Sequence, residues 1–404
     1  MSSSFRILVV SDLHVHQGKP TDASSPSYIS ARPEYRGAKV NPIEGIIPLL
    51  ENKKLALDWI VCAGDIGDKS DAVSAAIAWR HLEDVRKRLH ARRLIGNVGN
   101  HDVDSRREMQ HEQPDQALKA LTPPFPIGDN KLCEKFWAHD CVVWKDRRAN
   151  ATLALVNSCG LHGVAVGGGH DPEHLRGFVT DNVLGRLSEE LPQKLSRFNI
   201  LLMHHHIRQH PWFPDDVSHA VNGPKLLDIL KGTGVPWLVV HGHQHVPNLS
   251  YSDASALAPT ILSAGSLAAR RLYPVQGRTP RNQLYLIDFD VDDPDPKRIS
   301  ALVFAWNWTP GVGWLEANPD SGLPRQTGFG YRDDLRALAD KVKQQLGAAP
   351  ASRLRWEQLL ERVPELQYLI RDDLEQVIAR LVADSVMVDF DRWSCPSVFE
   401  RGSG

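Results

Sequence analysis

The sequence predicts an α/β protein in which a mainly parallel sheet is covered by helices on both sides, followed by a small helical module. Two observations carry this prediction. Short runs rich in Val, Ile and Leu alternate with longer amphipathic stretches along most of the 404 residues. Several of these runs also end in a cluster of polar residues, as expected where parallel strands meet at one edge of a sheet.

The apolar runs are the expected strands. Phe5–Val10 (FRILVV) is short and β-branched, and the polar residues SDLH follow it directly. By the same pattern, further strands are expected at residues 57–62, 94–98, 152–157, 199–203, 237–240, 260–265, 284–290 and 299–306. Apolar residues at helical spacing predict helices over residues 71–90 and 181–191.

Two long segments show no clear periodicity. Residues 17–54 are too long for a plain connection, so we expect a loop beside the site that the polar clusters form. Residues 309–332 are rich in Gly, Pro and Asn, which indicates a linker or covering loop. The chain is thereby divided into a large α/β domain, residues 1–308, the linker, and a C-terminal helical module, residues 333–404.

The C-terminal module has its own pattern. Helices are expected at residues 333–346, 354–362 and 372–383, and the β-rich stretch SVMVDF follows them. This order resembles a winged-helix module. Residues 351–404 hold seven Arg, no Lys and ten Asp or Glu, and this acidic balance argues against a surface that follows a phosphate backbone. A protein partner or dimerisation is the favoured role.

Composition excludes several classes of protein. The net charge of −2 gives no general attraction to nucleic acid or to anionic membranes. The five cysteines are scattered without a CxxC pair, which is typical of reduced and mostly buried thiols. No apolar stretch approaches the length of a membrane span, and the N-terminus does not resemble a signal peptide. We therefore expect a soluble cytoplasmic protein with no membrane partner.

Five polar clusters follow the expected strands: Asp12-Leu13-His14, Gly64-Asp65, Gly99-Asn100-His101-Asp102, His204-His205-His206 and Gly242-His243-Gln244-His245. They offer carboxylate, imidazole and amide donors and no cysteine. Such a set suits Mn²⁺, Fe, Zn²⁺ or Co²⁺. The spacings D-x-H and H-x-H let two side chains reach one place from a strand end, and the glycines allow close approach of the backbone.

These clusters, in this order and each after a strand, resemble the calcineurin-like metallophosphoesterase superfamily from residue 5 to about residue 290. The stretches ILSAGSL and LYLIDFD are similar to the closing strands of that family. The resemblance implies a four-layer α/β/β/α sandwich and hydrolysis of a phosphoester with two divalent metal ions. Mn²⁺ is the expected metal, with Fe, Zn²⁺ or Co²⁺ as alternatives.

The resemblance also implies site residues. One ion would be held by four side chains, Asp12, His14, Asp65 and His245. Asp65 would bridge to the second ion, held also by Asn100, His204 and His243. The neighbouring His205 is the alternative to His204, which is favoured because the apolar run LLM ends at it. His101 would act beside the leaving-group oxygen, and Asp102 would orient its ring.

Other polar residues near the clusters have plainer interpretations. His241 is expected to be a buried structural residue. Asp68 could touch the site, but a helix cap or a solvated residue is the favoured interpretation. The loop histidines His16, His162, His170 and His174 are expected at the surface. The arginine doublets at residues 92–93, 106–107, 147–148 and 270–271 form either a solvated face or a phosphate-binding rim, with the solvated face preferred.

The favoured function is that of a metal-dependent phosphodiesterase on nucleic acid (DNA or RNA) or a nucleotide, because GNHD is more typical of the phosphodiesterase and nuclease branches than of protein phosphatases. A phosphomonoesterase acting on a small metabolite or phosphoprotein is the first alternative. A non-catalytic metal-binding regulatory protein is the second, although the complete ligand set and His101 argue against it. Whether residues 17–54 cover the site decides between a small substrate and a polymer.

Overall fold

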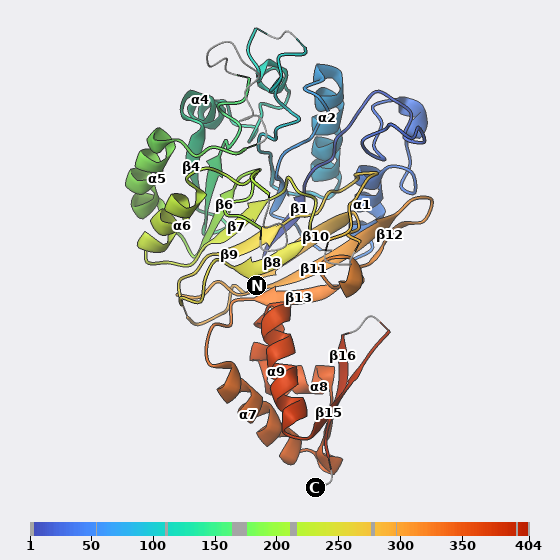
Figure 1. Ribbon diagram of the computed structural model, residues 1–404, viewed down its shortest axis with the longest axis vertical. Coiled ribbons are helices and arrows are strands. Elements are labelled where there is room, and N and C mark those ends of the chain that lie inside the picture. The colour runs from blue at the N-terminus through green and yellow to red at the C-terminus, as the bar shows by residue number, and fades with distance from the viewer. Residues whose placement is uncertain are drawn as a thin grey trace.

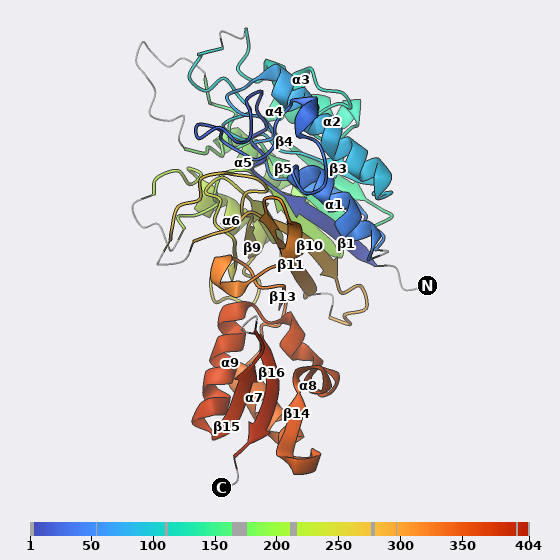
Figure 2. The ribbon, with the colours of Figure 1, turned by 90° about the vertical axis from the view of Figure 1, so that its right-hand side faces the viewer.

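The computed structural model describes residues 4–53, 55–109, 112–163, 176–210, 216–275, 279–295, 297–392 and 395–402. Two mixed sheets lie face to face in the larger part of the molecule, and a smaller module follows them at the C-terminal end (Figures 1 and 2). The loop histidines His170 and His174 lie outside the described residues.

Seven strands of the described chain form the first sheet, in the order β12-β11-β10-β1-β2-β3, with β13 also paired to β11. Their bounds are β1 Phe5–Val10, β2 Trp59–Cys62, β3 Arg93–Ile95, β10 Gln283–Phe289, β11 Ala301–Thr309, β12 Gly313–Glu316 and β13 Gln326–Phe329. The strands β1, β2 and β3 are parallel, whereas β10 pairs antiparallel with β1 and β11. The sheet is therefore mixed, and not mainly parallel as the alternation of elements alone predicts.

Six strands of the described chain form the second sheet, in the order β4-β5-β6-β7-β9-β8. Their bounds are β4 Cys141–Asp146, β5 Ala151–Val156, β6 Phe198–Leu202, β7 Leu238–His241, β8 Asn248–Tyr251 and β9 Thr260–Ser263. The central strands β5, β6, β7 and β9 are parallel, and an antiparallel strand lies at each edge. The expected strands of both sheets are confirmed to within a few residues.

The two sheets share one core. Phe5 on β1 stacks on Phe198 of β6 with ring centroids 5.3 Å apart, and both side chains are nearly fully buried. On the first sheet, this core continues into α1 (Pro42–Glu51) and α2 (Ala72–Arg88). A second core joins the outer face of the second sheet to α5 (Asp181–Lys194) and α6 (Gly223–Gly232). The helices thus cover the outer faces, and the four-layer arrangement is confirmed (Figure 1).

Local sequence explains where the helices begin. Asp71 caps α2 by accepting the Ser74 backbone N–H, and Thr180 caps α5 by accepting that of Val183. Shorter helices, α3 (Gln116–Lys119) and α4 (Asn130–His139), lead to β4. No helix of the described chain is long and apolar enough to cross a membrane.

The two segments without periodicity differ from expectation. Residues 309–332, expected to be a linker or covering loop, hold β12 and β13, which both pair with β11. Each is four residues long and partly exposed, so it shows little apolar alternation and is stabilised by pairing with the longer β11. Within residues 17–54, the second half forms α1, whose signal is weakened by Pro48 inside the helix.

The C-terminal module has its own core and a three-stranded sheet in the order β14-β16-β15. Its elements are α7 Leu335–Gly347, β14 Arg353–Arg355, α8 Trp356–Arg362, α9 Arg371–Ala383, β15 Val386–Phe390 and β16 Pro396–Arg401. Three helices followed by a two-stranded wing are the winged-helix order that the sequence predicts. The module contacts the first sheet through β13, where the Gly328 backbone N–H donates to the Leu369 carbonyl oxygen.

Candidate metal centre

The loops that follow β1, β2, β3, β6 and β7 bring the five polar clusters together at one edge of the two sheets. Five of the candidate ligands have positive φ angles: Asp12, His14, Asp65, His243 and His245. This left-handed conformation is uncommon for residues other than glycine, and it clusters at functional sites where the surrounding structure stabilises it. The strained turns aim these side chains back toward one another.

One group of donors consists of Asp12, His14 and His245. The Nε2 atoms of His14 and His245 lie 3.0 Å apart, and Nε2 of His245 lies 3.4 Å from Oδ1 of Asp12. Asp12 is fully buried, and the His243 backbone N–H donates to its carboxylate. Two imidazole nitrogens and a carboxylate oxygen therefore converge on one point.

A second group gathers around Asn100. Its Oδ1 lies 3.1 Å from Nε2 of His204 and 2.9 Å from Nδ1 of His243. The other ring nitrogen of His204 lies 2.8 Å from the Ala63 carbonyl oxygen, an arrangement that fixes the tautomer of a metal-binding histidine. Of the three adjacent histidines, the structure brings His204 to this group.

Asp65 connects the two groups. Its Oδ2 lies 3.7 Å from Nε2 of His14 and 3.4 Å from Nε2 of His204, while its Oδ1 accepts the His101 backbone N–H. The carboxylate is 1% exposed. This is the position that a carboxylate bridging two ions requires.

Glycines make this density of side chains possible. A Cβ on Gly99 would lie 2.1 Å from Oδ1 of Asp65, and one on Gly242 would lie 2.4 Å from Oδ2 of Asp12. Gly64 has a φ of +111°, and a Cβ there would lie 2.6 Å from Nδ1 of His204. The close approach of the backbone that the sequence predicts at these three glycines is confirmed.

The charges of the centre favour ionised carboxylates. Burial alone would raise the pKa of Asp12, but the neighbouring His245 outweighs it and lowers that pKa to about 2. For Asp65, burial is likewise outweighed, chiefly by His204, and the pKa lies well below its usual value. Burial, together with the charge of His101, lowers the pKa of His14 to about 4. Anionic carboxylates and a neutral imidazole are the forms that bind divalent cations.

His101 lies at the open side of the centre. Its side chain is 42% exposed, and its ring lies edge-on to that of His14 with centroids 4.7 Å apart. Its Nδ1 lies 3.0 Å from Oδ1 of Asp68. Burial opposes protonation of this imidazole, but Asp65 and Asp68 outweigh it and raise its pKa to about 9. The ring lies beside the candidate ligands, and its ring nitrogen also comes within metal-binding range of His14 and Asp68.

The prediction that Asp102 orients His101 is wrong. The Asp102 carboxylate turns away from the ring and accepts the backbone N–H groups of Gly67 and Gly99. Burial, and next the charge of Asp65, raise the pKa of Asp102 to about 7. Both of its oxygens are used to hold the loops that carry the ligands, so Asp68 takes the orienting position. In the stretch GDIGD, Asp68 follows the candidate ligand Asp65 by only three residues, and this spacing is the sequence feature that indicates a place for Asp68 near the centre.

The remaining residues that the sequence singles out lie apart from the ligand groups. His241 is 2% exposed and packs against His206, with ring centroids 4.4 Å apart, as expected for a structural residue. His16 and His162 are buried, so the expectation that they lie at the surface is wrong. Both occupy loops that fold back over strand ends.

Two of the arginine doublets, at residues 92–93 and 270–271, are engaged elsewhere in the structure. Arg92 pairs with Asp58 and Asp146, and Arg93 lies over the ring of Trp144. Arg270 donates to the carbonyl oxygens of Pro20 and Asp22 and so stabilises the first part of the segment 17–53. These cations are structural.

The donor set fits two divalent metal ions. Polar atoms of neighbouring side chains in this set of seven lie 2.9 to 3.7 Å apart, which is the range of separations of ligands around a common ion. The Nε2 atoms of His14 and His245 lie close enough for one to donate a hydrogen bond to the other, and the same spacing lets both lone pairs bind one cation between them. No cysteine belongs to the set, so hard or borderline metals suit it.

Comparison with known protein families agrees with this geometry. Residues 5–247 match the calcineurin-like phosphoesterase family. The chain belongs to this family. All seven candidate ligands and His101 lie within the matched residues, so the protein is a dimetal phosphoesterase whose substrate is a phosphoester. Residues 327–383 match the calcineurin-associated winged helix-turn-helix family, which confirms the predicted module.

Similarities to individual proteins are low. No curated protein matches the chain. Among solved structures, a dimetal phosphatase from Danio rerio is 11% identical, with a TM-score of 0.46, over 77% of this chain and 98% of its own. The purple acid phosphatase PPD1 from yellow lupin (Lupinus luteus) seeds is 12% identical, with a TM-score of 0.45, over 80% of this chain and 57% of its own. Values this low carry no argument about the substrate.

Proposed function

We propose that this calcineurin-like phosphoesterase is a Mn²⁺-dependent phosphodiesterase that acts on nucleic acid or a nucleotide. The observation that supports the proposal most directly is the complete convergence of seven oxygen and nitrogen donors beside an exposed His101. A non-catalytic regulatory protein would have no need of an exposed imidazole, held by Asp68, at the open side of the ligands.

In this proposal, Asp12, His14 and His245 would hold one ion, and Asp65 would be shared between the two ions. The second ion is held by three further side chains, Asn100, His204 and His243. Two bound divalent ions supply an activated hydroxide and charge for the phosphoryl oxygens. The buried carboxylates Asp12 and Asp65 supply the negative charge that holds the two cations close together.

His101 has the proton-transfer role. Its pKa is raised by Asp65 and Asp68, so the ring carries a proton, and Asp68 holds Nδ1. The opposite nitrogen is left to donate to the leaving-group oxygen as the ester bond breaks. The backbone N–H of His101 donates to Asp65 and fixes the distance between the acid and the ligands.

Charge favours a diester over a monoester. A phosphomonoester carries up to two negative charges at neutral pH, and sites for it commonly add Arg or Lys side chains to the metals. Among the hydrogen bonds and ion pairs of the described residues, the candidate ligands pair with one another and with backbone groups, and the doublets at residues 92–93 and 270–271 are engaged elsewhere. The singly charged diester is the better match to this site.

The position of residues 17–53 supports a polymer as well as a nucleotide. This segment runs along residues 266–271: Ser27 bridges to Ala269, and the Tyr28 backbone N–H donates to the Ala268 carbonyl oxygen. It is thereby fixed beside the centre, and His101 keeps 42% of its side chain exposed. The partial exposure of His101 supports access for a strand of nucleic acid as well as for a nucleotide.

The test is hydrolysis by the purified protein with added Mn²⁺. The substrates are bis-p-nitrophenyl phosphate, p-nitrophenyl phosphate, and labelled single- and double-stranded DNA and RNA. We expect kcat/KM for the diester to exceed that for the monoester, together with cleavage of at least one nucleic acid. Asn100→Ala and His101→Ala should each lower the rate, by about 100-fold or more for His101→Ala.

The matched control is His139→Ala. His139 is an exposed histidine at the end of α4 and belongs to none of the five polar clusters. It should retain the wild-type rate. Turnover of the monoester alone would replace this proposal with a phosphatase. Bound metal without turnover of any substrate would favour the regulatory alternative.

A further inference from the structure

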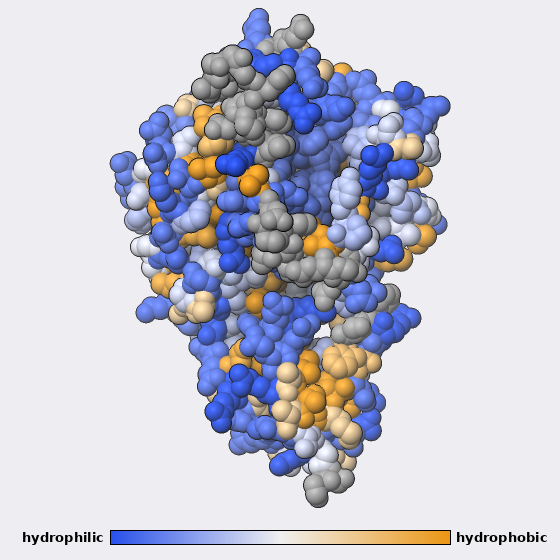
Figure 3. All heavy atoms as spheres, in the orientation of Figure 1, coloured by the Kyte–Doolittle hydropathy of each residue, from blue (hydrophilic) through white to orange (hydrophobic). Residues whose placement is uncertain are grey.

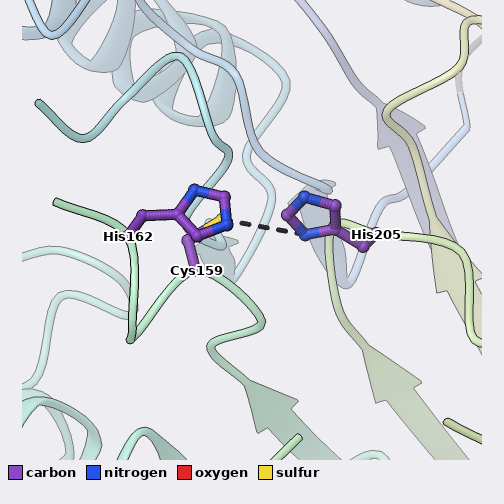
Figure 4. Close-up of side chains that lie close together, drawn as sticks. All are labelled: Cys159, His162 and His205. Carbon is purple, nitrogen blue, oxygen red and sulfur yellow. Dashed lines mark hydrogen bonds between the residues drawn. The ribbon is translucent and has the colours of Figure 1, made fainter. Parts of the chain in front are cut away.

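A separate group of side chains with metal-ligand chemistry lies next to the candidate metal centre. These side chains take no part in the proposed reaction. Cys159 and His162 lie in the loop after β5, and His205 lies in the loop after β6. Figure 4 shows the two imidazole rings facing each other with the cysteine beside them. Two loops far apart in sequence thus contribute one sulfur and two nitrogen donors to the same place.

The geometry is close to that of a zinc site. Sγ of Cys159 lies 3.8 Å from Nδ1 of His205, and the three donor atoms all lie within 4.8 Å of one another. With Zn–S of about 2.3 Å and Zn–N of about 2.0 Å, tetrahedral ligation separates sulfur and nitrogen by about 3.6 Å. Small side-chain shifts are enough to close the three donors on one ion.

The three side chains lie in the protein interior, and the ring of His162 has polar groups on both sides. The three side chains are 2%, 3% and 0% exposed. Nδ1 of His162 lies 3.2 Å from Oγ of Ser105, which donates to the Asn100 carbonyl oxygen. Such an outer hydrogen bond orients the ring of a metal-binding histidine. The Arg176 carbonyl oxygen, 2.8 Å from Nε2 of His162, lies next to the group and is available as a fourth ligand.

The two ring nitrogens of His205 differ in their surroundings. Nδ1 lies 2.8 Å from Oγ of Ser158 and 3.8 Å from Sγ of Cys159, whereas Nε2 is buried with no hydrogen-bond partner. A bound cation would use the sulfur as a thiolate, and the thiol proton would be released to solvent.

We propose that Cys159, His162 and His205 bind a single Zn²⁺ ion, distinct from the paired metals, that fastens the loop after β5 to the loop after β6. The mixed sulfur and nitrogen set favours Zn²⁺, whereas the paired-metal centre offers three oxygen and four nitrogen donors and no sulfur. His205 is adjacent to His204, and its ring packs against that of His243 at a centroid distance of 4.4 Å. By fixing the His205 ring, the zinc ion would therefore also stabilise the positions of His204 and His243 in the paired-metal centre.

The test uses Co²⁺ as the probe, since a thiolate ligand gives a charge-transfer absorption in the near ultraviolet that oxygen and nitrogen ligands do not. The full chain is stripped of metal with a chelator and titrated with Co²⁺. We expect a thiolate band whose final intensity corresponds to one thiolate-bound ion for each chain, reached by the time that three equivalents of Co²⁺ have filled this site and the paired centre. Cys159→Ser should abolish it, and Cys133→Ser, a matched control at a buried cysteine in α4, should retain it.

A second variant distinguishes loss of the metal site from misfolding of the protein. His162→Gln keeps the sulfur but removes one nitrogen, and we expect at least about a tenfold loss of Co²⁺ affinity in the thiolate band. Asn100→Ala, in the paired-metal centre, should leave the band unchanged, which separates this proposal from the proposed function. The absence of a thiolate band from the wild-type protein, or a band that survives Cys159→Ser, would overturn the proposal.

Discussion

Oδ2 of Asp65 lies 3.7 Å from Nε2 of His14 and 3.4 Å from Nε2 of His204, so one buried carboxylate joins the two groups of donors. The two histidines come from different sheets, since His14 follows β1 and His204 follows β6. The position of one sheet against the other therefore fixes the distances between Oδ2 of Asp65 and these two candidate ligands.

Asp65→Asn should remove the charge that bridges the two ions while keeping the size of the side chain. We expect metal content to fall from two equivalents toward one or none, and kcat/KM to fall by at least about 100-fold, because several kcal/mol of charge stabilisation are lost. Elemental analysis after gel filtration measures the first effect, and diester hydrolysis the second. Retention of two tightly bound ions by the variant would contradict the bridging role.

Asp68→Asn should change the pH dependence of the reaction. His101 acts in its protonated form, so activity falls as pH rises through its pKa, which Asp65 and Asp68 raise. Removing one of these charges moves the alkaline limb of the kcat/KM profile to lower pH and lowers the rate by about tenfold or more. An unchanged alkaline limb would mean that Asp68 does not act through His101.

Asp102→Ala provides the contrast with Asp68. Because Asp102 holds the Gly67 and Gly99 backbone N–H groups, its removal leaves two buried donors without a partner. We expect a loss of stability of about 1–3 kcal/mol for each, seen in chemical denaturation. The alkaline limb of the residual activity should stay where it is in the wild type. A shift of that limb would restore Asp102 as the residue that orients His101.

Gly99→Ala should disturb the centre through backbone contact. The new Cβ would lie 2.1 Å from Oδ1 of Asp65 and 2.3 Å from its backbone nitrogen, so the loops must move apart. We expect loss of metal binding and a decrease in stability of about 1–3 kcal/mol. Gly185→Ala is the control: no atom lies within 4 Å of its Cβ on α5, and removing a helical glycine should stabilise the protein by up to about 1 kcal/mol.

The C-terminal module should not bind DNA through α9. Residues 351–404 are acidic overall, and α9 carries Asp372, Asp373 and Glu375 in its first turns. An apolar groove of about 230 Å³ lies beside the helix, lined by residues that include Trp356, Leu360 and Ile378, and Figure 3 shows apolar surface on this module. These features support the proposal of a protein partner or dimerisation.

Arg380→Ala checks this proposal, because Arg380 is an exposed cation on α9. Fluorescence anisotropy of the full chain with duplex DNA, measured over a range of salt concentrations, should give the same affinity and the same salt dependence as the wild type. A salt slope smaller by about one would reveal a phosphate contact and reverse the assignment.

The sequence by itself determined which kinds of side chain gather at the centre. Asp12, Asp65, Asn100 and His243 each follow an apolar run that can only be a buried strand, and the ends of parallel strands meet at one edge. The close backbone approach at the glycines beside these residues could also be predicted from the sequence, because a dense cluster of polar side chains requires it. Strand order and the presence of two sheets came only through resemblance to a family.

Tertiary structure alone decided which neighbour in each cluster faces the centre. His204 and His205 are adjacent and chemically identical, yet one reaches Asn100 and the other reaches Cys159. Asp102 follows His101 directly, yet the distant Asp68 holds its ring. Turns with positive φ set these directions, and no local periodicity encodes them. For the same reason β12 and β13 were missed, since pairing with β11 stabilises them and their own pattern does not.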